Sequence, residues 1–310
     1  MKSKILFACV NLPICLVLVG GLFACKKQPE SKNDFSDYAG QWKNYRSEER
    51  VEFNLTKDGD VELVGSGYYD VAFAYKGKIV SKNGQYEYDL DPLSGWGQGS
   101  KETGTLTLNR EGNKVRLVFA QKPAEVFSKE FVFFKEGEPF DVDFKGQMPT
   151  VLDFFKAVYP HVFNPVIDWA YNSIVNGKSS SSIPDDKTVD FQNGYISFVP
   201  GDCGPCSTME CCFWITADKS RCLFAIATHG ESPDIQPTTF LQFYEYDVAK
   251  GTMQEIDPPF DLKKSNKEED WHIVLPKNGT DIKVQFITDD YDEKSSMLLK
   301  WNGKGFDVKK

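Results

Sequence analysis

The sequence has little histidine and a deficit of basic residues. Its three histidines, His161, His229 and His272, lie in three separate segments of the 310-residue chain. The HExxH, Gly-x-Ser-x-Gly and Walker-type motifs of zinc proteases, α/β-hydrolases and P-loop proteins are not present. The 36 lysines and arginines are outnumbered by 45 aspartates and glutamates, for a net charge of −9. We therefore assign no catalytic residue, metal ligand or cofactor, and the acidic balance argues against nucleic acid as a partner.

The sequence also lacks an uninterrupted apolar run long enough to remain in a bilayer as a helix. The apolar stretch from Ile5 to Gly21 contains an asparagine and a proline, and Lys2 and Lys4 precede it. This arrangement predicts an export signal over residues 1–24 that is removed from the mature chain. Its removal leaves 34 basic and 45 acidic residues, a net charge of −11.

The predicted signal ends in Leu22-Phe23-Ala24-Cys25, which resembles the lipobox of bacterial lipoproteins. The resemblance implies that the Cys25 thiol receives a diacylglyceryl group, that the chain is cut before it, and that the new amine is acylated with a fatty acid such as palmitate. Several acyl chains anchor a protein firmly to a membrane. The alternative is an ordinary cleaved signal in which Cys25 is incidental.

Residues 25–37 are polar and are expected to form a flexible tether to the membrane. In the enterobacterial sorting pattern an acidic residue after the lipidated cysteine retains a lipoprotein in the inner membrane. Lys26 stands at that position. The localisation expected is therefore the cell envelope, with the outer membrane favoured.

Residues 38–146 are predicted to form an antiparallel β-domain. Val51, Phe53 and Leu55 alternate with polar residues, which is the period of a half-buried strand. The same alternation recurs between turn sequences such as Asp58-Gly59-Asp60 and gives about eight short strands. Eight strands suffice to close a small barrel, and a small sandwich is the alternative.

The start of this domain, Gly40-Gln41-Trp42, resembles the Gly-x-Trp opening of lipocalin-like domains. The resemblance implies that Trp42 plugs one end of a barrel and that a basic side chain packs over it. In lipocalins this basic side chain is an arginine. No arginine at the corresponding place is evident in this sequence, and Lys129 is the basic residue nearest the final strand. Trp42 and Trp96 are the candidate ligand-binding residues. Trp96 lies in a glycine-rich loop of the kind that contacts ligands at a barrel mouth, unless it folds back on its own barrel.

Residues 147–177 are predicted to form a pair of helices. The first carries apolar residues at i, i+3, i+4 and i+7 from Val151 and ends before Pro160. In the second, Asn164 is a suitable N-cap, Pro165 suits the first turn, and Gly177 suits the left-handed end. Residues 178–188 are predicted to be a linker.

Residues 189–310 are predicted to form an open antiparallel β-meander. Four hairpins are expected, with strands at Phe213–Ala217 and Cys222–Thr228, Phe240–Tyr246 and Thr252–Ile256, Trp271–Leu275 and Ile282–Ile287, and Met297–Trp301 and Phe306–Val308. The fold class expected for the whole chain is mainly β, with a small antiparallel barrel or sandwich, a helical pair and a β-meander domain.

A cluster of cysteines lies at the start of the second β-domain. The favoured interpretation is a loop held by disulfides, because an exported chain meets an oxidising compartment and crosslinks remove entropy from the unfolded state. The candidates are Cys203, Cys206, Cys211 and Cys212, whose pairing is open. Cys222 is expected to be a buried apolar thiol, on the same strand face as Phe213 and Ile215.

Two other interpretations of the cluster stay open. Cys203-Gly204-Pro205-Cys206 resembles the redox centre of thioredoxins, but that centre requires a helix directly after it, and Asp202 opposes activation of the neighbouring thiol. The Cys203–Cys206 spacing also suits two ligands of a zinc knuckle.

The two hypotheses for function belong to different classes. The favoured one is a membrane-anchored envelope lipoprotein, more a binding protein than an enzyme, which takes a small ligand, a glycan or a partner protein. The alternative is a thiol-disulfide oxidoreductase or zinc-binding protein that uses Cys203 and Cys206. The lipidated start followed by β-domains resembles the lipoproteins of Bacteroidetes-type envelopes, and this resemblance carries no mechanism.

Overall fold

The computed structural model describes most of the chain from residue 34 onward, and it corrects the end of the predicted tether, because Phe35 is 1% exposed in a hydrophobic core. The described residues are 34–46, 49–66, 71–82, 84–93, 100–126, 128–179, 182–201, 207–230, 238–260, 270–287 and 293–309, and residues 33–310 form one compact unit. The predicted signal, Cys25, Trp96, Cys203 and Cys206 lie outside the described residues. Within the described part, no helix has the length and apolar character needed to span a bilayer.

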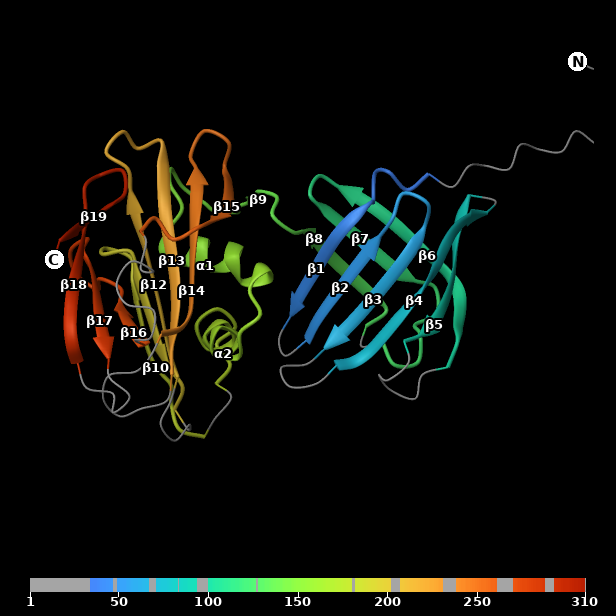
Figure 1. The fold of residues 1–310 in the computed structure, drawn as a ribbon, viewed down its shortest axis with the longest axis horizontal. Helices are drawn as coiled ribbons and strands as arrows, with labels where there is room; N and C mark the ends of the chain where they lie inside the picture. The colour runs from blue at the N-terminus through green and yellow to red at the C-terminus, as the bar shows by residue number, and fades with distance from the viewer. Residues whose placement is uncertain are drawn as a thin grey trace, which may run out of the picture. The chain divides into compact units, whose positions relative to one another are not determined.

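The first half of the unit is a closed antiparallel barrel, drawn from blue to green in Figure 1. Each strand pairs with the next, and β1 also pairs with β8 through Trp42 and Lys135, which closes the barrel and removes its edges. The barrel alternative of the prediction is therefore confirmed over the sandwich. The strands are β1 Gly40–Arg46, β2 Glu49–Leu55, β3 Asp60–Ser66, β4 Val71–Lys82, β5 Gln85–Pro92, β6 Glu102–Glu111, β7 Lys114–Phe119 and β8 Glu130–Lys135.

The barrel interior is filled with side chains. The predicted alternation in β2 is confirmed, since Val51, Phe53 and Leu55 are each only 1% exposed. They join a buried core that is rich in aromatic residues and includes Trp42, Phe73, Tyr75, Phe119, Phe131 and Phe133. Close packing of this kind makes the barrel interior a hydrophobic core of the protein.

Two helices follow the barrel. They are α1 Val151–Val158 and α2 Pro165–Ile174, with a short 3-10 turn η1 at Tyr159–His161 between them. Thr150 caps α1 in a reciprocal box with Asp153, and Asn164 caps α2 by accepting from the backbone of Val166 and Ile167. Gly177 lies beyond α2 with φ +65°. The predicted ends of both helices are thus confirmed.

The second half of the unit contains two antiparallel sheets. The larger has seven strands in the order β10-β11-β12-β13-β14-β15-β9. Its strands are β9 Phe140–Asp141, β10 Asp186–Asp190, β11 Tyr195–Val199, β12 Thr208–Ile215, β13 Arg221–His229, β14 Thr238–Asp247 and β15 Thr252–Ile256. The smaller sheet is formed by β16 Asp270–Val274, β17 Ile282–Ile287, β18 Glu293–Trp301 and β19 Phe306–Lys309.

The four predicted hairpins are all present, but the meander divides into two sheets. Two segments also differ from the sequence prediction. Phe140–Asp141, placed with the first β-domain, pairs with β15 of the larger sheet, and β10 begins at Asp186 within the predicted linker. Short edge strands carry too few alternating residues to be distinguished from loops in the sequence.

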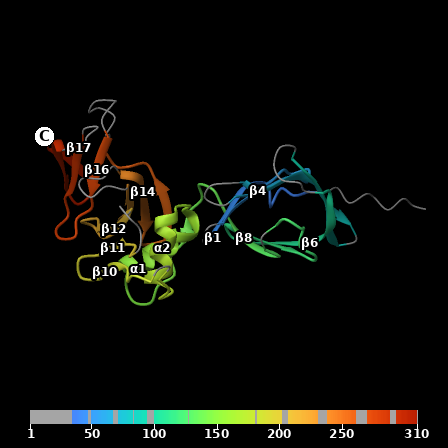
Figure 2. The same ribbon diagram turned by 90° about the horizontal axis from the view of Figure 1, so that it is seen from below.

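The larger sheet is covered on both faces. Helices α1 and α2 pack on one face around Phe154, Phe155 and Ile167, and the smaller sheet packs on the other around Trp214, Phe243 and Leu299. Figure 2 shows the helices and the smaller sheet on opposite sides of β12 and β14. Burial of both faces explains why β13 is apolar without interruption from Cys222 to Ala227, and eight of its nine residues are buried.

Candidate ligand-binding cleft

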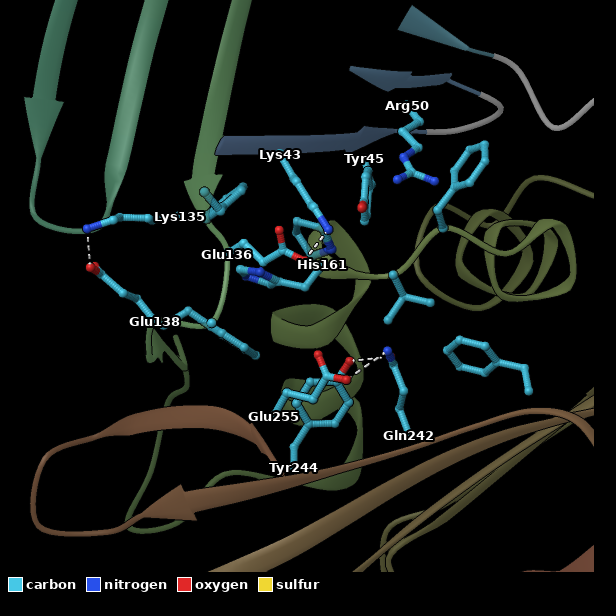
Figure 3. A pocket seen from close by; sticks show the side chains of 17 residues that line it. Lys43, Tyr45, Arg50, Lys135, Glu136, Glu138, His161, Gln242, Tyr244 and Glu255 are labelled. Atoms are coloured by element: carbon cyan, nitrogen blue, oxygen red, sulfur yellow. Dashed lines mark hydrogen bonds and ion pairs between the residues drawn. The ribbon is translucent and has the colours of Figure 1, made fainter. Parts of the chain in front are cut away.

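A cleft with a volume of about 320 Å³ lies where the end of the barrel meets η1 and the β14–β15 hairpin. Figure 3 shows its side chains. They combine aromatic rings with charged and amide groups: Lys43, Tyr45, Arg50, Phe134, Lys135, Glu136, Gly137, Glu138, Phe140, Pro160, His161, Val162, Phe163, Phe240, Gln242, Tyr244 and Glu255. Ligand sites of proteins are typically concave, partly apolar and furnished with a few polar groups, as this cleft is.

The His161 imidazole forms part of the aromatic wall. Its ring lies nearly parallel to that of Phe140, with 3.8 Å between centroids and 18° between planes, and 4.6 Å from the ring of Phe134. Burial lowers the pKa of His161 to about 3, and the ammonium of Lys114 adds to this effect. At neutral pH His161 is therefore an uncharged aromatic ring with hydrogen-bonding nitrogens.

A cation–π cluster forms a second part of the wall. The Tyr45 ring from β1 lies 5.8 Å from that of Phe163, which follows η1. The guanidinium carbon of Arg50 lies 5.4 Å from the Tyr45 centroid and 5.9 Å from the Phe163 centroid. Such contacts hold a cation against two ring faces and fix the ring positions. Arg50 also pairs with Glu52 on the same strand.

The other cations of the cleft are likewise paired with carboxylates. Lys43 donates to Glu136, and Lys135 lies 2.6 Å from Glu138. Burial lowers the pKa of Lys43, but the hydrogen bond to Glu136 and the nearby Tyr45 hydroxyl outweigh this, so the pKa lies above its usual value. Lys43 therefore remains an ammonium, and its charge is balanced within the cleft.

A hydrogen-bonded chain of three side chains forms the opposite side. The Tyr244 hydroxyl donates to Gln242 Oε1 at 2.6 Å, and Gln242 Nε2 donates to Glu255 Oε1 at 3.1 Å. In Figure 3, Gln242, Tyr244 and Glu255 rise from the hairpin on the side of the cleft that faces Lys43 and Glu136. Burial raises the pKa of Glu255, and although the Lys43 ammonium opposes the rise, the Glu136 carboxylate adds to it.

Trp42 lies outside this cleft, in the core of the barrel. It is 0% exposed, and its indole Nε1 donates to the carbonyl of Tyr38 at 2.8 Å. The basic side chain over its ring is Arg110, whose guanidinium carbon is 5.6 Å from the ring centroid, with Lys135 at 6.0 Å. Trp42 is therefore a core residue of the barrel, and the expectation that it contacts a ligand is corrected. Trp96, the other candidate, lies outside the described residues.

The cysteines of the cluster that the structure describes lie in β12, since this strand begins at Thr208, earlier than predicted. Cys211 and Cys212 are free thiols, 0% and 2% exposed, and belong to the cores on opposite faces of the sheet. Adjacent strand residues point to opposite faces, so these side chains are small apolar core residues here and form no loop crosslink in this structure.

Cys222 is a free, buried thiol, as expected, and it pairs across the hairpin with Ile215. Cys203 and Cys206 lie outside the described residues. The chain enters them from β11 and leaves them into a strand, β12, whereas a thioredoxin-type centre requires a helix at this point. Among the described residues, no group of three or more His, Cys, Asp and Glu side chains is placed to hold a metal ion.

Sequence reasoning missed the cleft residues, because they come from distant segments. One local signal was available in β14, where Gln242 lies between Phe240 and Tyr244 on a single strand face. Burial of a polar side chain costs free energy unless the side chain is hydrogen-bonded. A polar residue in an apolar row therefore indicates either a hydrogen-bond partner in the protein or a ligand-binding site.

Comparison with models of protein families, with curated proteins and with solved structures finds no match to this chain.

Proposed function

We propose that this protein is a lipid-anchored protein of the bacterial cell envelope that binds a small polar ligand in the cleft between the barrel end and the β14–β15 hairpin. The observation that carries the proposal is the composition of the cleft. It combines a rigid aromatic wall with a small set of polar groups in a volume of about 320 Å³, near the lower end of the range for small-molecule sites.

Binding is favoured over catalysis because the ionisable side chains of the cleft are engaged with one another. Lys43 is bonded to Glu136, Lys135 to Glu138, and Gln242 to Glu255. Groups held in this way are oriented for recognition, and their orientation lowers the entropy lost when a ligand binds. The cell-envelope location and the anchor at Cys25 rest on the sequence of the first residues alone.

The proposal is tested by screening a library of small polar metabolites, neutral and charged, for thermal stabilisation of residues 33–310. Any compound that binds the cleft should lose its effect on Gln242→Trp, which fills the space with an indole. Gln254→Trp is the matched control, because Gln254 is an exposed neighbour on β15 that does not line the cleft. If no compound stabilises the protein, or if hits act equally on both variants, the proposal is wrong.

The anchor is tested separately in a host that processes lipoproteins. The full chain should incorporate labelled palmitate and partition with the membrane fraction, and Cys25→Ser should abolish both. An unlabelled wild-type chain would show that Cys25 is not lipidated.

A further inference from the structure

Building on the proposed function, we infer that the cleft takes a neutral saccharide, with Gln242 and Glu255 as the hydrogen-bonding pair that selects its hydroxyl groups. The inference rests on three features of the cleft: a side-chain amide with a fixed orientation next to a carboxylate, charges that balance one another, and aromatic rings around them.

The orientation of the Gln242 amide is determined by its two neighbours. Glu255 carries a carboxylate, which can only accept, so the NH₂ group of Gln242 must face it. The amide oxygen then faces Tyr244, whose hydroxyl donates to it. Each bond requires the other, and the amide is held in one of its two possible orientations.

This arrangement leaves a donor and an acceptor side by side. Gln242 keeps its second N–H, and Glu255 keeps its second carboxylate oxygen, beyond the bond that joins the two side chains. A hydroxyl group both accepts and donates, so one hydroxyl, or two on adjacent carbons, can satisfy both positions. Adjacent hydroxyls on a ring are characteristic of saccharides in their cyclic form.

The charges of the cleft argue against an ionic ligand. Lys43, Arg50 and Lys135 each pair with a glutamate, so a carboxylate or phosphate ligand would have to displace an existing partner. A ligand anion at Gln242 would be repelled by the Glu255 carboxylate, and the Lys43 ammonium, whose charge acts on Glu255, would offset the attraction of that carboxylate for a ligand cation. A neutral ligand neither displaces a paired side chain nor meets a charge of its own sign.

The rings supply the remaining contact. One face of a pyranose ring consists of C–H groups, which pack against aromatic side chains, while its edge carries the hydroxyls. Tyr45, His161, Phe163 and Phe240 line the same cleft as Gln242, and each keeps part of its surface exposed in addition to the ring and cation contacts described above. The Arg50 guanidinium keeps two of these rings in place.

The test compares sugars that differ only in charge. Glucose, glucuronate and glucosamine, and the same series built on galactose and mannose, are titrated into residues 33–310 at neutral pH and followed by NMR line broadening of the sugar. In at least one series, the neutral sugar should bind about tenfold more tightly than both charged relatives, which corresponds to one unfavourable charge contact of about 1.4 kcal/mol.

Two variants assign the effect to the proposed pair. Gln242→Ala should weaken binding of the neutral sugar about tenfold, because it removes one donor and releases Glu255. Glu255→Gln should reverse part of the selectivity and strengthen binding of the uronate relative to the neutral sugar, since the repelling charge is gone. Gln254→Ala, on the same strand as Glu255, should change neither the affinity for the neutral sugar nor the selectivity against the uronate.

The outcomes separate this inference from the proposed function. Uronate or amino sugar binding as tight as the neutral sugar would overturn the inference, as would equal effects of Gln242→Ala and Gln254→Ala. Absence of binding by every neutral sugar at about 10 mM, well above the dissociation constant of a specific site, would overturn it too. A different metabolite that stabilises the wild-type protein against heat, but not Gln242→Trp, would then still support the proposed function.

Discussion

The Arg110 guanidinium lies over the indole ring of Trp42, with 5.6 Å between its Cζ atom and the ring centroid. Arg110 Nε donates to the carbonyl of Gly112 at 2.9 Å, and Nη1 donates to the carbonyl of Asp37. The arginine on β6 thus connects the barrel wall to the segment that precedes β1. Because Trp42 is fully buried, this contact covers a ring that belongs to the barrel core.

Replacement of Arg110 by alanine should lower the free energy of unfolding by about 1 kcal/mol, which is the size of a cation–π contact at an exposed site. The change is measured by urea denaturation. Arg116→Ala is the matched control on β7, because Arg116 is exposed and pairs with Glu130 at the surface, and it should have no measurable effect. Equal effects of the two substitutions would show that the contact with Trp42 adds no stability.

The strands of the barrel could be predicted because one face of each is apolar and the other polar. The choice between a closed barrel and a sandwich was left open, since closure depends on the pairing of the first strand with the last. The side chain over Trp42 was missed for a related reason. A basic residue was sought near the final strand, at Lys129, whereas Arg110 reaches the ring from β6.

The cysteine cluster shows a different limit of sequence analysis. Glycine, proline and adjacent cysteines suggested a loop as far as residue 212, yet Cys211 and Cys212 fill two cores on either side of one strand. A strand buried on both faces loses the alternation that identifies a half-buried one. The cleft could not be predicted for another reason, because residues such as Lys43 and Glu255 line it from distant segments that only the tertiary fold brings together.

The burial of His161 should make the folded protein less stable in mild acid. The folded-state pKa of about 3 lies below the value near 6.5 of an exposed histidine, so between these values the unfolded chain binds a proton that the folded chain does not. Stability is therefore lost as the pH falls below about 6.5, by about 1.4 kcal/mol per pH unit from this residue.

His161→Phe should remove this pH dependence while keeping the ring stacked on Phe140. Between about pH 7 and pH 5, the wild-type protein should lose about 2 kcal/mol more of its unfolding free energy than the variant does. Urea denaturation of both proteins across this range provides the measurement, and the variant serves as the control for all other titrating groups. Parallel curves would mean that His161 is protonated as easily in the folded protein as in the unfolded chain.

The three free thiols of the described residues, Cys211, Cys212 and Cys222, should be unreactive in the folded protein. Burial raises the pKa of Cys222 to about 11 and the pKa values of Cys211 and Cys212 well above their usual range. Since the thiolate is the nucleophile, iodoacetamide at neutral pH should leave all three unmodified until denaturant is added. Mass spectrometry of proteolytic fragments identifies each site. Rapid labelling of Cys211 or Cys212 without denaturant would contradict their placement in the two cores.

A second polar network joins the two sheets of the C-terminal half. Glu210 on β12 accepts hydrogen bonds from the Tyr195 hydroxyl and, at 3.2 Å, from the backbone N–H of Leu275, which follows β16 of the smaller sheet. His229 Nε2 lies 3.4 Å from the same carboxylate. Partial burial raises the pKa of Glu210, but the hydrogen bonds from His229 and Tyr195 outweigh it and hold the pKa below its usual value.

Glu210→Ala should lower the free energy of unfolding by about 3 kcal/mol, because it leaves several buried donors without an acceptor. Glu210→Gln should recover part of the loss, since an amide oxygen still accepts one hydrogen bond. Glu245→Ala is the control, because Glu245 pairs with Arg221 at the surface and its loss should cost less than about 1 kcal/mol. Denaturant titrations of the three variants rank them directly. If Glu210→Ala were no more destabilising than Glu245→Ala, the contact between the sheets would depend on their apolar core alone, and the carboxylate would contribute nothing to joining them.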